Sequence, residues 1–201
     1  DLRQPLQAMD LALSRLRRDA PPAQLPDIDG LQDGIRTMAD ILDGLLLLSQ
    51  LEADSLQAQP ATCELQGLFA ELLAAHHERA RLAGVSLHAN AQALAVTTDP
   101  GLLAGLLGRL LDNAINATPA GGRVLLAARV RGERVRIEVR DSGIGIAPVH
   151  QPRVFDEFFQ VGNPERDHRK GFGLGLAIVS RLATLLGGRV ELRSRLHGGS
   201  C

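Results

Sequence analysis

The chain has 201 residues and a formal net charge of −1, from 22 lysines and arginines against 23 aspartates and glutamates. This balance provides no overall field to attract nucleic acid, and no apolar run approaches the roughly 18 residues that span a bilayer. Cys63 and Cys201 make no disulfide framework, so we expect a cytoplasmic protein without nucleic acid and without direct membrane contact.

Two helices are predicted at the beginning of the chain. Their apolar residues recur at steps of four and three, which is typical of a coiled-coil seam. The segment 20–26 between them predicts a connector, because its prolines stop a helix, and Asp27 or Asp29 is expected to cap the second helix. The two seams are Leu2, Leu6, Met9, Leu13 and Leu16, and then Leu31, Ile35, Met38, Leu42 and Leu45.

Two seamed helices joined by a short connector predict an antiparallel hairpin. A lone hairpin leaves half of its apolar surface in water, so the sequence predicts a homodimer in which two hairpins form a four-helix bundle. The alternative is a hairpin that packs only on its own globular domain. We assign the hairpin to residues 1–58 and a second domain to residues 59–201, after a proline-marked linker.

The second domain is predicted to contain both helices and strands. His76 and His77 are expected on the solvated side of its first helix. Asp99 followed by Pro100 is a helix-start signal, with a capping oxygen and then a proline in the first turn. Alternating apolar residues predict strands. The predicted helices are 64–83, 100–117, part of 147–160 and 174–186, and the predicted strands are 85–90, 94–97, 123–130, 135–140 and 189–195.

A glycine-spaced turn, Asp141-Ser-Gly-Ile-Gly-Ile146, follows the strand at 135–140. The carboxylate of Asp141 can accept a hydrogen bond from an exocyclic amine such as that of adenine. Gly143 and Gly145 permit positive φ and leave room for a ring against the backbone. Alone, such a turn is weak evidence for a nucleotide site.

A second glycine cluster, Gly171-Phe-Gly-Leu-Gly-Leu176, runs directly into the helix at 174–186. Unpaired N–H groups and the helix dipole together make the N-terminus of a helix an anion site. The polar segment 161–170 between the two clusters predicts a loop. Most of the phenylalanines of the chain lie near this loop.

In this order, Asp112-Asn113-Ala114 and the two glycine clusters resemble the N, G1 and G2 boxes of the GHKL ATPases, and in detail the catalytic domain of bacterial sensor histidine kinases. Phe155-Asp-Glu-Phe-Phe159 is similar to the F box of that family, and Gly199-Ser200 to its last glycine motif. The resemblance implies an α-helical hairpin, half of a dimeric four-helix bundle, followed by an α/β two-layer sandwich with a mixed sheet.

The resemblance also implies a site for ATP and Mg²⁺, with Asn113 as the metal ligand, since its oxygen suits a hard cation that also holds phosphate oxygens. The segment 161–170 would be the ATP lid, in which His168 is a further candidate for phosphate contact. The residues implied in nucleotide binding are Asn113, Asn116, Asp141, Gly143, Gly145, Phe155, Phe158, Arg166, Arg169, Lys170, Gly171, Gly173, Gly175 and Leu176.

The start of the hairpin, Asp1-Leu-Arg-Gln-Pro-Leu6, resembles the end of the H box of the family. The phosphoacceptor histidine would then lie one position before Asp1, so the chain that begins at Asp1 is expected not to phosphorylate itself. By resemblance, Asp1 orients the imidazole and accepts its proton, and Gln4 orients a water. An upstream input domain and the receiver domain of a response regulator, whose aspartate takes the phosphoryl group, are the implied partners.

The sequence departs from the family pattern at two positions of the N box. Relatives usually carry asparagine in place of Arg109, and lysine followed by an aromatic residue in place of Asn116-Ala117. Three interpretations therefore stay open: an active histidine kinase core, a signalling module with a degenerate nucleotide pocket, or another GHKL ATPase of the chaperone or gyrase kind. The heptad hairpin disfavours the third interpretation.

Overall fold

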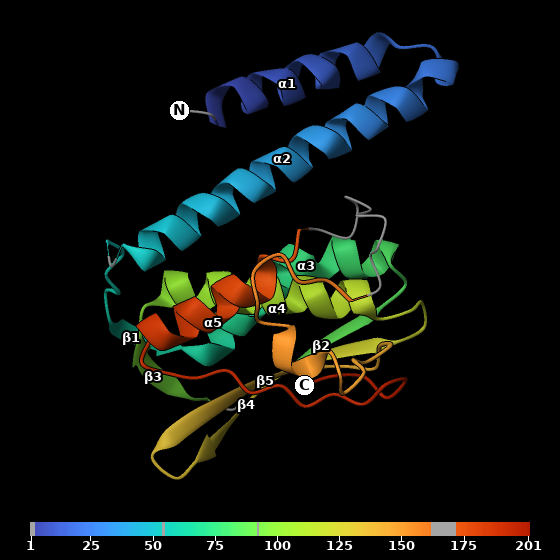
Figure 1. Ribbon diagram of the computed structural model, residues 1–201. Helices are drawn as coiled ribbons and strands as arrows, with labels where there is room; N and C mark the ends of the chain where they lie inside the picture. The colour runs from blue at the N-terminus through green and yellow to red at the C-terminus, as the bar shows by residue number, and fades with distance from the viewer. Residues whose placement is uncertain (1–2, 54, 92, 162–171) are drawn as a thin grey trace.

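The computed structural model describes residues 3–53, 55–91, 93–161 and 172–201, apart from the side chains of Arg3 and Arg36. A long helical hairpin lies over an α/β sandwich (Figure 1). No helix in these four ranges is both long and apolar enough to cross a membrane. The hairpin consists of α1 (Arg3–Asp19), the 3₁₀ turn η1 (Pro22–Gln24) and α2 (Leu25–Glu52).

The connector of the hairpin is shorter than predicted. α2 begins at Leu25 and has Pro26 in its first turn, where the missing N–H of proline costs nothing. The N-cap is Gln24, whose side chain makes no capping bond, so the prediction that Asp27 or Asp29 caps this helix is wrong. Asp29 instead pairs with Arg17 of α1, at 2.8 Å.

The predicted seam packs only partly within one hairpin. Ile35 is buried, whereas five seam residues expose between 41% and 60% of their surface. A partly buried polar contact joins the two helices, since Gln32 Nε2 donates to Ser14 Oγ at 3.0 Å. The hairpin therefore presents an apolar stripe that its own packing leaves uncovered. The exposed seam residues are Met9, Leu16, Leu31, Met38 and Leu45.

The α/β domain contains a mixed sheet, as predicted. The central strand β4 pairs in parallel with β2 and antiparallel with β5, in the order β2-β4-β5. Two shorter strands, β1 and β3, pair antiparallel with each other. The strands are β1 (Ala61–Glu64), β2 (Ser86–Ala91), β3 (Ala95–Thr98), β4 (Arg123–Arg131) and β5 (Arg134–Asp141).

Three helices, α3 (Leu65–Leu82), α4 (Pro100–Ala117) and α5 (Gly175–Leu185), cover one face of the sheet (Figure 1). Asp99 caps α4 as predicted, because its Oδ1 accepts the Leu102 N–H at 3.0 Å. The helices and the inner sheet face form one apolar core, and the fold class is confirmed. The fully buried side chains of this core include Phe69, Leu65, Leu107, Leu111, Ile115, Leu126, Ile178, Leu182, Val124 and Val179.

Two predictions about local structure are wrong, and a third is borne out by a very short helix. The short helix predicted within 147–160 is the 3₁₀ turn η2 (Gln151–Arg153). Residues 189–195 form no strand; only Ser194 bridges to Ser200, and Arg193 exchanges both backbone hydrogen bonds with Cys201. His76 is not solvated, because its side chain is only 14% exposed and its Nδ1 lies 2.8 Å from the Leu72 carbonyl.

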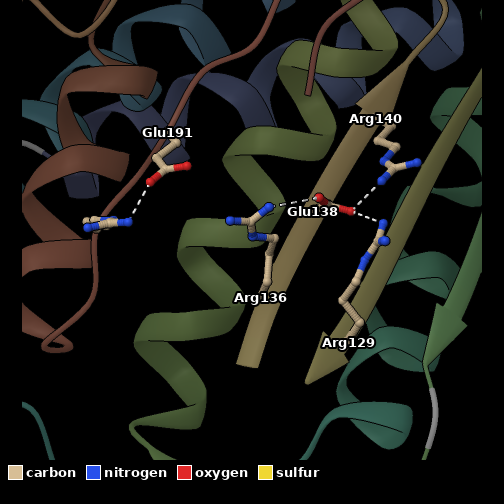
Figure 2. Close-up of polar contacts among 6 residues, drawn as sticks. Arg129, Arg136, Glu138, Arg140 and Glu191 are labelled. Atoms are coloured by element: carbon tan, nitrogen blue, oxygen red, sulfur yellow. Dashed lines mark hydrogen bonds and ion pairs between the residues drawn. The ribbon is translucent and has the colours of Figure 1, made fainter. Parts of the chain in front are cut away.

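The outer face of the sheet carries arginines around one carboxylate, Glu138 of β5 (Figure 2). Glu138 Oε2 accepts hydrogen bonds from Arg140, at 2.6 Å, and from Arg129, and Arg136 lies 4.0 Å from Oε1. Burial acts to raise the pKa of Glu138, but the hydrogen bonds and charges of Arg140 and Arg129 lower it below its ordinary value of 4.5. The carboxylate is thus held ionised.

A depressed pKa predicts how stability depends on pH. The contribution of ionised Glu138 is present above pH 4.5 and is lost as pH falls through the lower pKa of the folded state. Glu138→Gln should lower the free energy of unfolding by about 2 kcal/mol at pH 7, and the loss should shrink in acid. Urea unfolding at pH 7 and below pH 4 measures this, with Glu133→Gln in the exposed turn as control. An equal loss at both pH values would contradict it.

Candidate functional site

Asp141 lies at the end of β5, at the start of the first glycine turn. Its Oδ1 accepts the N–H of Gly143 at 2.8 Å and that of Ser200 at 3.2 Å. Its Oδ2 accepts no hydrogen bond from the part of the chain that the structure describes. Burial raises the pKa of Asp141, although these two backbone hydrogen bonds act in the opposite direction. One carboxylate oxygen is therefore fixed by the backbone, and the other is left for a ligand.

The first glycine turn is packed against the end of α4. The Ile144 N–H donates to the Ala117 carbonyl at 3.0 Å, and a Cβ on Gly143 would overlap the same carbonyl oxygen. Gly145 has φ of +64°, and a Cβ there would overlap the Arg195 carbonyl. Both predicted glycines are required by close backbone contacts, which brings Asp141 near the end of the helix that carries Asn113.

The segment 193–201 holds this turn from the other side. Ser194 Oγ accepts the Ile146 N–H at 2.7 Å and lies 2.8 Å from Ser200 Oγ. Gln151 Nε2 donates to the carbonyls of Ile146, at 2.8 Å, and of Ser194, at 3.0 Å. The motif Gly199-Ser200 is thus joined to the loop of Asp141.

Sequence reasoning missed Ser194 and Gln151 as supports of the site. Their side chains act on backbone groups of the loop across 48 and 5 residues. A serine that bonds a distant N–H has no local sequence pattern, so no signal in the sequence could have identified Ser194. Gln151 follows Ile146 by only five residues, but one glutamine in a turn is not a specific signal either.

Asn113 is exposed on α4 and lies beside the start of α5. A Cβ on Gly175 would be 3.5 Å from Asn113 Nδ2 and 3.9 Å from its Oδ1. The first turn of α5 has Leu174 at its N-cap and no side-chain capping bond, so its N–H groups are left for a ligand. The structure thus brings Asn113, Gly175 and an uncapped helix N-terminus together, with Leu176 half-buried in the same turn.

The phenylalanine segment lies against the second glycine cluster. The Phe158 N–H donates to the Gly173 carbonyl at 3.1 Å, and Phe158 has a positive φ of 61° with 60% of its surface exposed. A Cβ on Gly173 would lie 2.7 Å from the Phe159 carbonyl. Phe155 is half-buried. Gly173 is therefore needed for the close approach of the two segments.

Asn116, one of the residues implied in nucleotide binding, is bound by a neighbouring arginine. Arg79 of α3 donates from Nη2 to Asn116 Oδ1 at 3.1 Å and pairs through Nη1 with Asp112 at 3.2 Å. The second atypical residue of the N box, Arg109, lines a groove of about 300 Å³ that Leu47 of α2 also lines. Both departures from the family pattern are therefore accommodated by neighbouring helices.

Several of the predicted site residues do not belong to the described part of the chain. Asp1, Arg166, Arg169, Lys170 and Gly171 lie outside the described residues, as does His168, and their roles stay predictions. Gln4 is exposed in the first turn of α1. The structure therefore brings Asp141, Gly143 and Gly145 to the end of α4, and it brings Asn113 of that helix to Gly175.

A magnesium site at Asn113 fits the donors present. Among the described residues, no three histidines, cysteines, aspartates or glutamates lie close enough to form a metal site by themselves. Asn113 offers one exposed amide oxygen beside the uncapped N-terminus of α5. A single protein oxygen suits Mg²⁺, which keeps waters and takes its other ligands from phosphates.

Comparison with known proteins identifies the family of the chain. Residues 98–201 match the family described as histidine kinase-, DNA gyrase B-, and HSP90-like ATPase. The sensor protein CreC of Escherichia coli (strain K12) is 34% identical over 202 residues, which is 99% of this chain and 42% of CreC. The sensor-like histidine kinase SenX3 of Mycolicibacterium smegmatis is 34% identical over 164 residues, 81% of this chain and 43% of SenX3.

Among solved structures, full-length ShkA in complex with AMPPNP superimposes with a TM-score of 0.81 and 28% identity, over 99% of this chain and 42% of ShkA. The chain spans less than half the length of these three relatives. Its hairpin, its mixed sheet and the ordered N, G1 and G2 boxes agree with the matches. The chain therefore belongs to the histidine kinase-, DNA gyrase B- and HSP90-like ATPase family, with the catalytic domain of a bacterial sensor histidine kinase.

Proposed function

We propose that this chain is the kinase core of a two-component sensor histidine kinase, with a hairpin domain at 1–58 and a catalytic domain at 59–201. It binds ATP with Mg²⁺ and transfers the γ-phosphoryl group to a histidine one position before Asp1. An aspartate of a response-regulator receiver domain then takes the phosphoryl group. The observation that carries the proposal is the Asp141 carboxylate, half-fixed by backbone N–H groups and close to the end of α4.

In this arrangement, different residues are suited to the adenine ring and to the phosphates of the nucleotide. Asp141 Oδ2 is suited to accept from the exocyclic amine of adenine, while Gly143 and Gly145 let the loop pack closely on the backbone of Ala117 and Arg195 and so hold Asp141 in place. The N-terminus of α5 and Asn113 are suited to phosphate oxygens and Mg²⁺. We assign Gly173, Gly175 and Leu176 to the phosphate end, and Phe155 and Phe158 to the support of the lid.

Catalysis of phosphoryl transfer depends mainly on positioning and on stabilisation of charge. Bound Mg²⁺ would neutralise phosphate charge. In the proposal, Asn113 orients the phosphates, Asp1 orients the acceptor imidazole and accepts its proton, and Gln4 orients a water for dephosphorylation of the regulator. Arg166, Arg169, Lys170 and Gly171 are proposed to close over the phosphates.

A calorimetric titration with ATP tests the nucleotide site, and a phosphotransfer assay tests the kinase. We expect saturable binding that weakens when Mg²⁺ is removed by EDTA. With a histidine placed before Asp1, radiolabelled γ-phosphate should appear on that histidine, and a histidine-to-glutamine variant is the control. Absence of binding would overturn the proposal.

The second candidate is a nucleotide-binding signalling module without phosphotransfer. Two observations favour it specifically: Arg109 replaces a polar amide with a cation at the groove next to α2, and Asn116 is bound to Arg79 rather than free for phosphate. Saturable ATP binding without label on the restored histidine would favour this candidate.

The uncovered stripe on the hairpin supports a homodimer. Because Leu31 and Met38 expose 59% and 47% of their surface, we expect a dimer in sedimentation velocity at micromolar concentration. Leu31→Glu with Met38→Glu should shift the protein to monomer, since charges in a seam are costly to bury. The control is Leu82→Glu, at a 72% exposed leucine of α3, which should stay dimeric. A monomeric wild-type protein would contradict the bundle.

A further inference from the structure

One face of α3 packs closely on α4. A Cβ built on Gly108 of α4 would lie 3.7 Å from Cε1 of His76, so the His76 ring covers α4 at a position without a side chain. Nδ1 of the same ring lies 2.8 Å from the Leu72 carbonyl. Arg79 follows His76 by three residues and therefore shares its face of α3. The packing thus brings Arg79 to the side of α4.

Arg79 contacts two polar residues of α4. Its Nη1 forms an ion pair with Asp112 Oδ1 at 3.2 Å, and its Nη2 donates to Asn116 Oδ1 at 3.1 Å. The guanidinium is therefore held at two points. A guanidinium has five N–H groups, and 51% of the Arg79 side chain is exposed, so donors are left for a further anion.

The held guanidinium lies next to the proposed site of magnesium and phosphate. Asn116 follows Asn113 by three residues, so the two side chains are neighbours on one face of α4, with about 5–6 Å between their Cβ atoms. Asn113 in turn lies beside Gly175 and the uncapped start of α5. A phosphate group bound there would have the Arg79 guanidinium within the reach of one helical turn.

Without Arg79, this face of α4 would disfavour phosphate. Asp112 directly precedes Asn113, and its side chain is 40% exposed, so its negative charge would repel a phosphate bound at Asn113. His76 Nε2 lies 3.7 Å from the same carboxylate, which is too long for a hydrogen bond. The ion pair with Arg79 offsets the charge of Asp112.

We propose that Arg79 is a phosphate-binding residue of the nucleotide site, supplied by α3 and held in place by Asp112 and Asn116. This proposal rests on the proposed function, because it needs nucleotide phosphates at Asn113. Asn116 is then a positioning residue, since it contacts the guanidinium rather than the phosphate. Asn116 carries no charge, and Arg79 brings a positive charge to this part of α4.

Calorimetric titration with ATP in the presence of Mg²⁺ tests the role of Arg79. Arg79→Gln should bind ATP about tenfold more weakly than wild type, a difference of about 1.4 kcal/mol, because one charge-assisted contact to phosphate is lost. The matched control is Arg81→Gln on the same helix. Arg81 pairs with Glu78 of α3 at 2.7 Å, so this variant should bind ATP as wild type does. Unchanged affinity in Arg79→Gln, or an equal loss in Arg81→Gln, would overturn the proposal.

A second substitution distinguishes a charge at the phosphates from a support of the fold. Asn116→Lys places a cation on α4, one turn from Asn113, and should restore most of the affinity that Arg79→Gln loses. A lysine at this position cannot replace the contacts that join α3 to α4. A loss of affinity that Asn116→Lys leaves in place would therefore mean that Arg79 acts only through the fold, and would overturn the proposal.

The two proposals fail in different ways. If wild-type protein binds no ATP, the proposed function fails and Arg79 has no phosphate to bind. If wild-type protein binds ATP and Arg79→Gln binds it equally well, the proposed function stands, and the positive charge at the phosphates comes from other residues.

Discussion

Asp141→Asn is expected to weaken ATP binding by about 10- to 100-fold, because a hydrogen bond to a charged acceptor contributes about 1.5–3 kcal/mol. The amide can keep its oxygen on the N–H groups of Gly143 and Ser200. Its NH₂ then takes the place of Oδ2 and presents a donor to the donor amine of adenine. Isothermal titration calorimetry measures the change in Kd.

The loss should not come from unfolding. The pKa of Asp141 is raised by burial above its ordinary value of 3.8, so above that pKa the ionised form costs stability, and the neutral amide avoids this cost. Asp141→Asn should therefore unfold at an equal or higher urea concentration at pH 7. The control is Asp27→Asn, at an exposed aspartate of α2. If ATP affinity is unchanged in Asp141→Asn, the nucleotide site is elsewhere.

Gly199→Ala should lower the free energy of unfolding by about 2–4 kcal/mol and also weaken ATP binding. Gly199 has φ of +81°, and a Cβ there would overlap the Asp141 carbonyl oxygen. Relief of the overlap has to move the segment 193–201 away from β5, which also removes the Ser200 N–H from Asp141 Oδ1. Urea unfolding and calorimetric titration measure the two effects.

Gly121 provides a matched control, because its φ of +84° is nearly the same and no atom lies within 4 Å of a Cβ built there. Gly121→Ala should lose only about 1 kcal/mol, the cost of the left-handed conformation. The excess loss in Gly199→Ala then measures the backbone overlap. Equal losses in the two variants would show that the segment moves freely and that the site does not depend on it.

The parts of the fold that could be predicted are those with local causes. The capping of α4 by Asp99 and the two strands β4 and β5 follow from neighbouring residues, and all were predicted. The strand predicted at 189–195 failed because an alternating pattern does not decide which partner receives the backbone hydrogen bonds. Here they go to residues 199–201 instead. His76 was misassigned because its burial depends on α4, which is distant in sequence.

The residues of the candidate site also divide into those with a local sequence pattern and those without one. Asp141, Gly143 and Asn113 could be proposed from the sequence because glycine spacing and residue order are visible in it. The support that Ser194 gives to the Asp141 loop could not, because Ser194 lies 48 residues from the Ile146 N–H that it accepts. Local sequence patterns indicate candidate ligand-binding residues, whereas long-range packing decides which neighbouring residues support those candidates.

The contact between Ser200 and Asp141 joins residues 59 positions apart, and this separation has a consequence during synthesis. When Asp141 leaves the ribosome, the serines that complete its loop have not yet been translated. The proposed adenine site at Asp141 therefore cannot form until residues 194–200 have emerged, so a nucleotide bound there cannot assist folding of the nascent sheet at earlier stages.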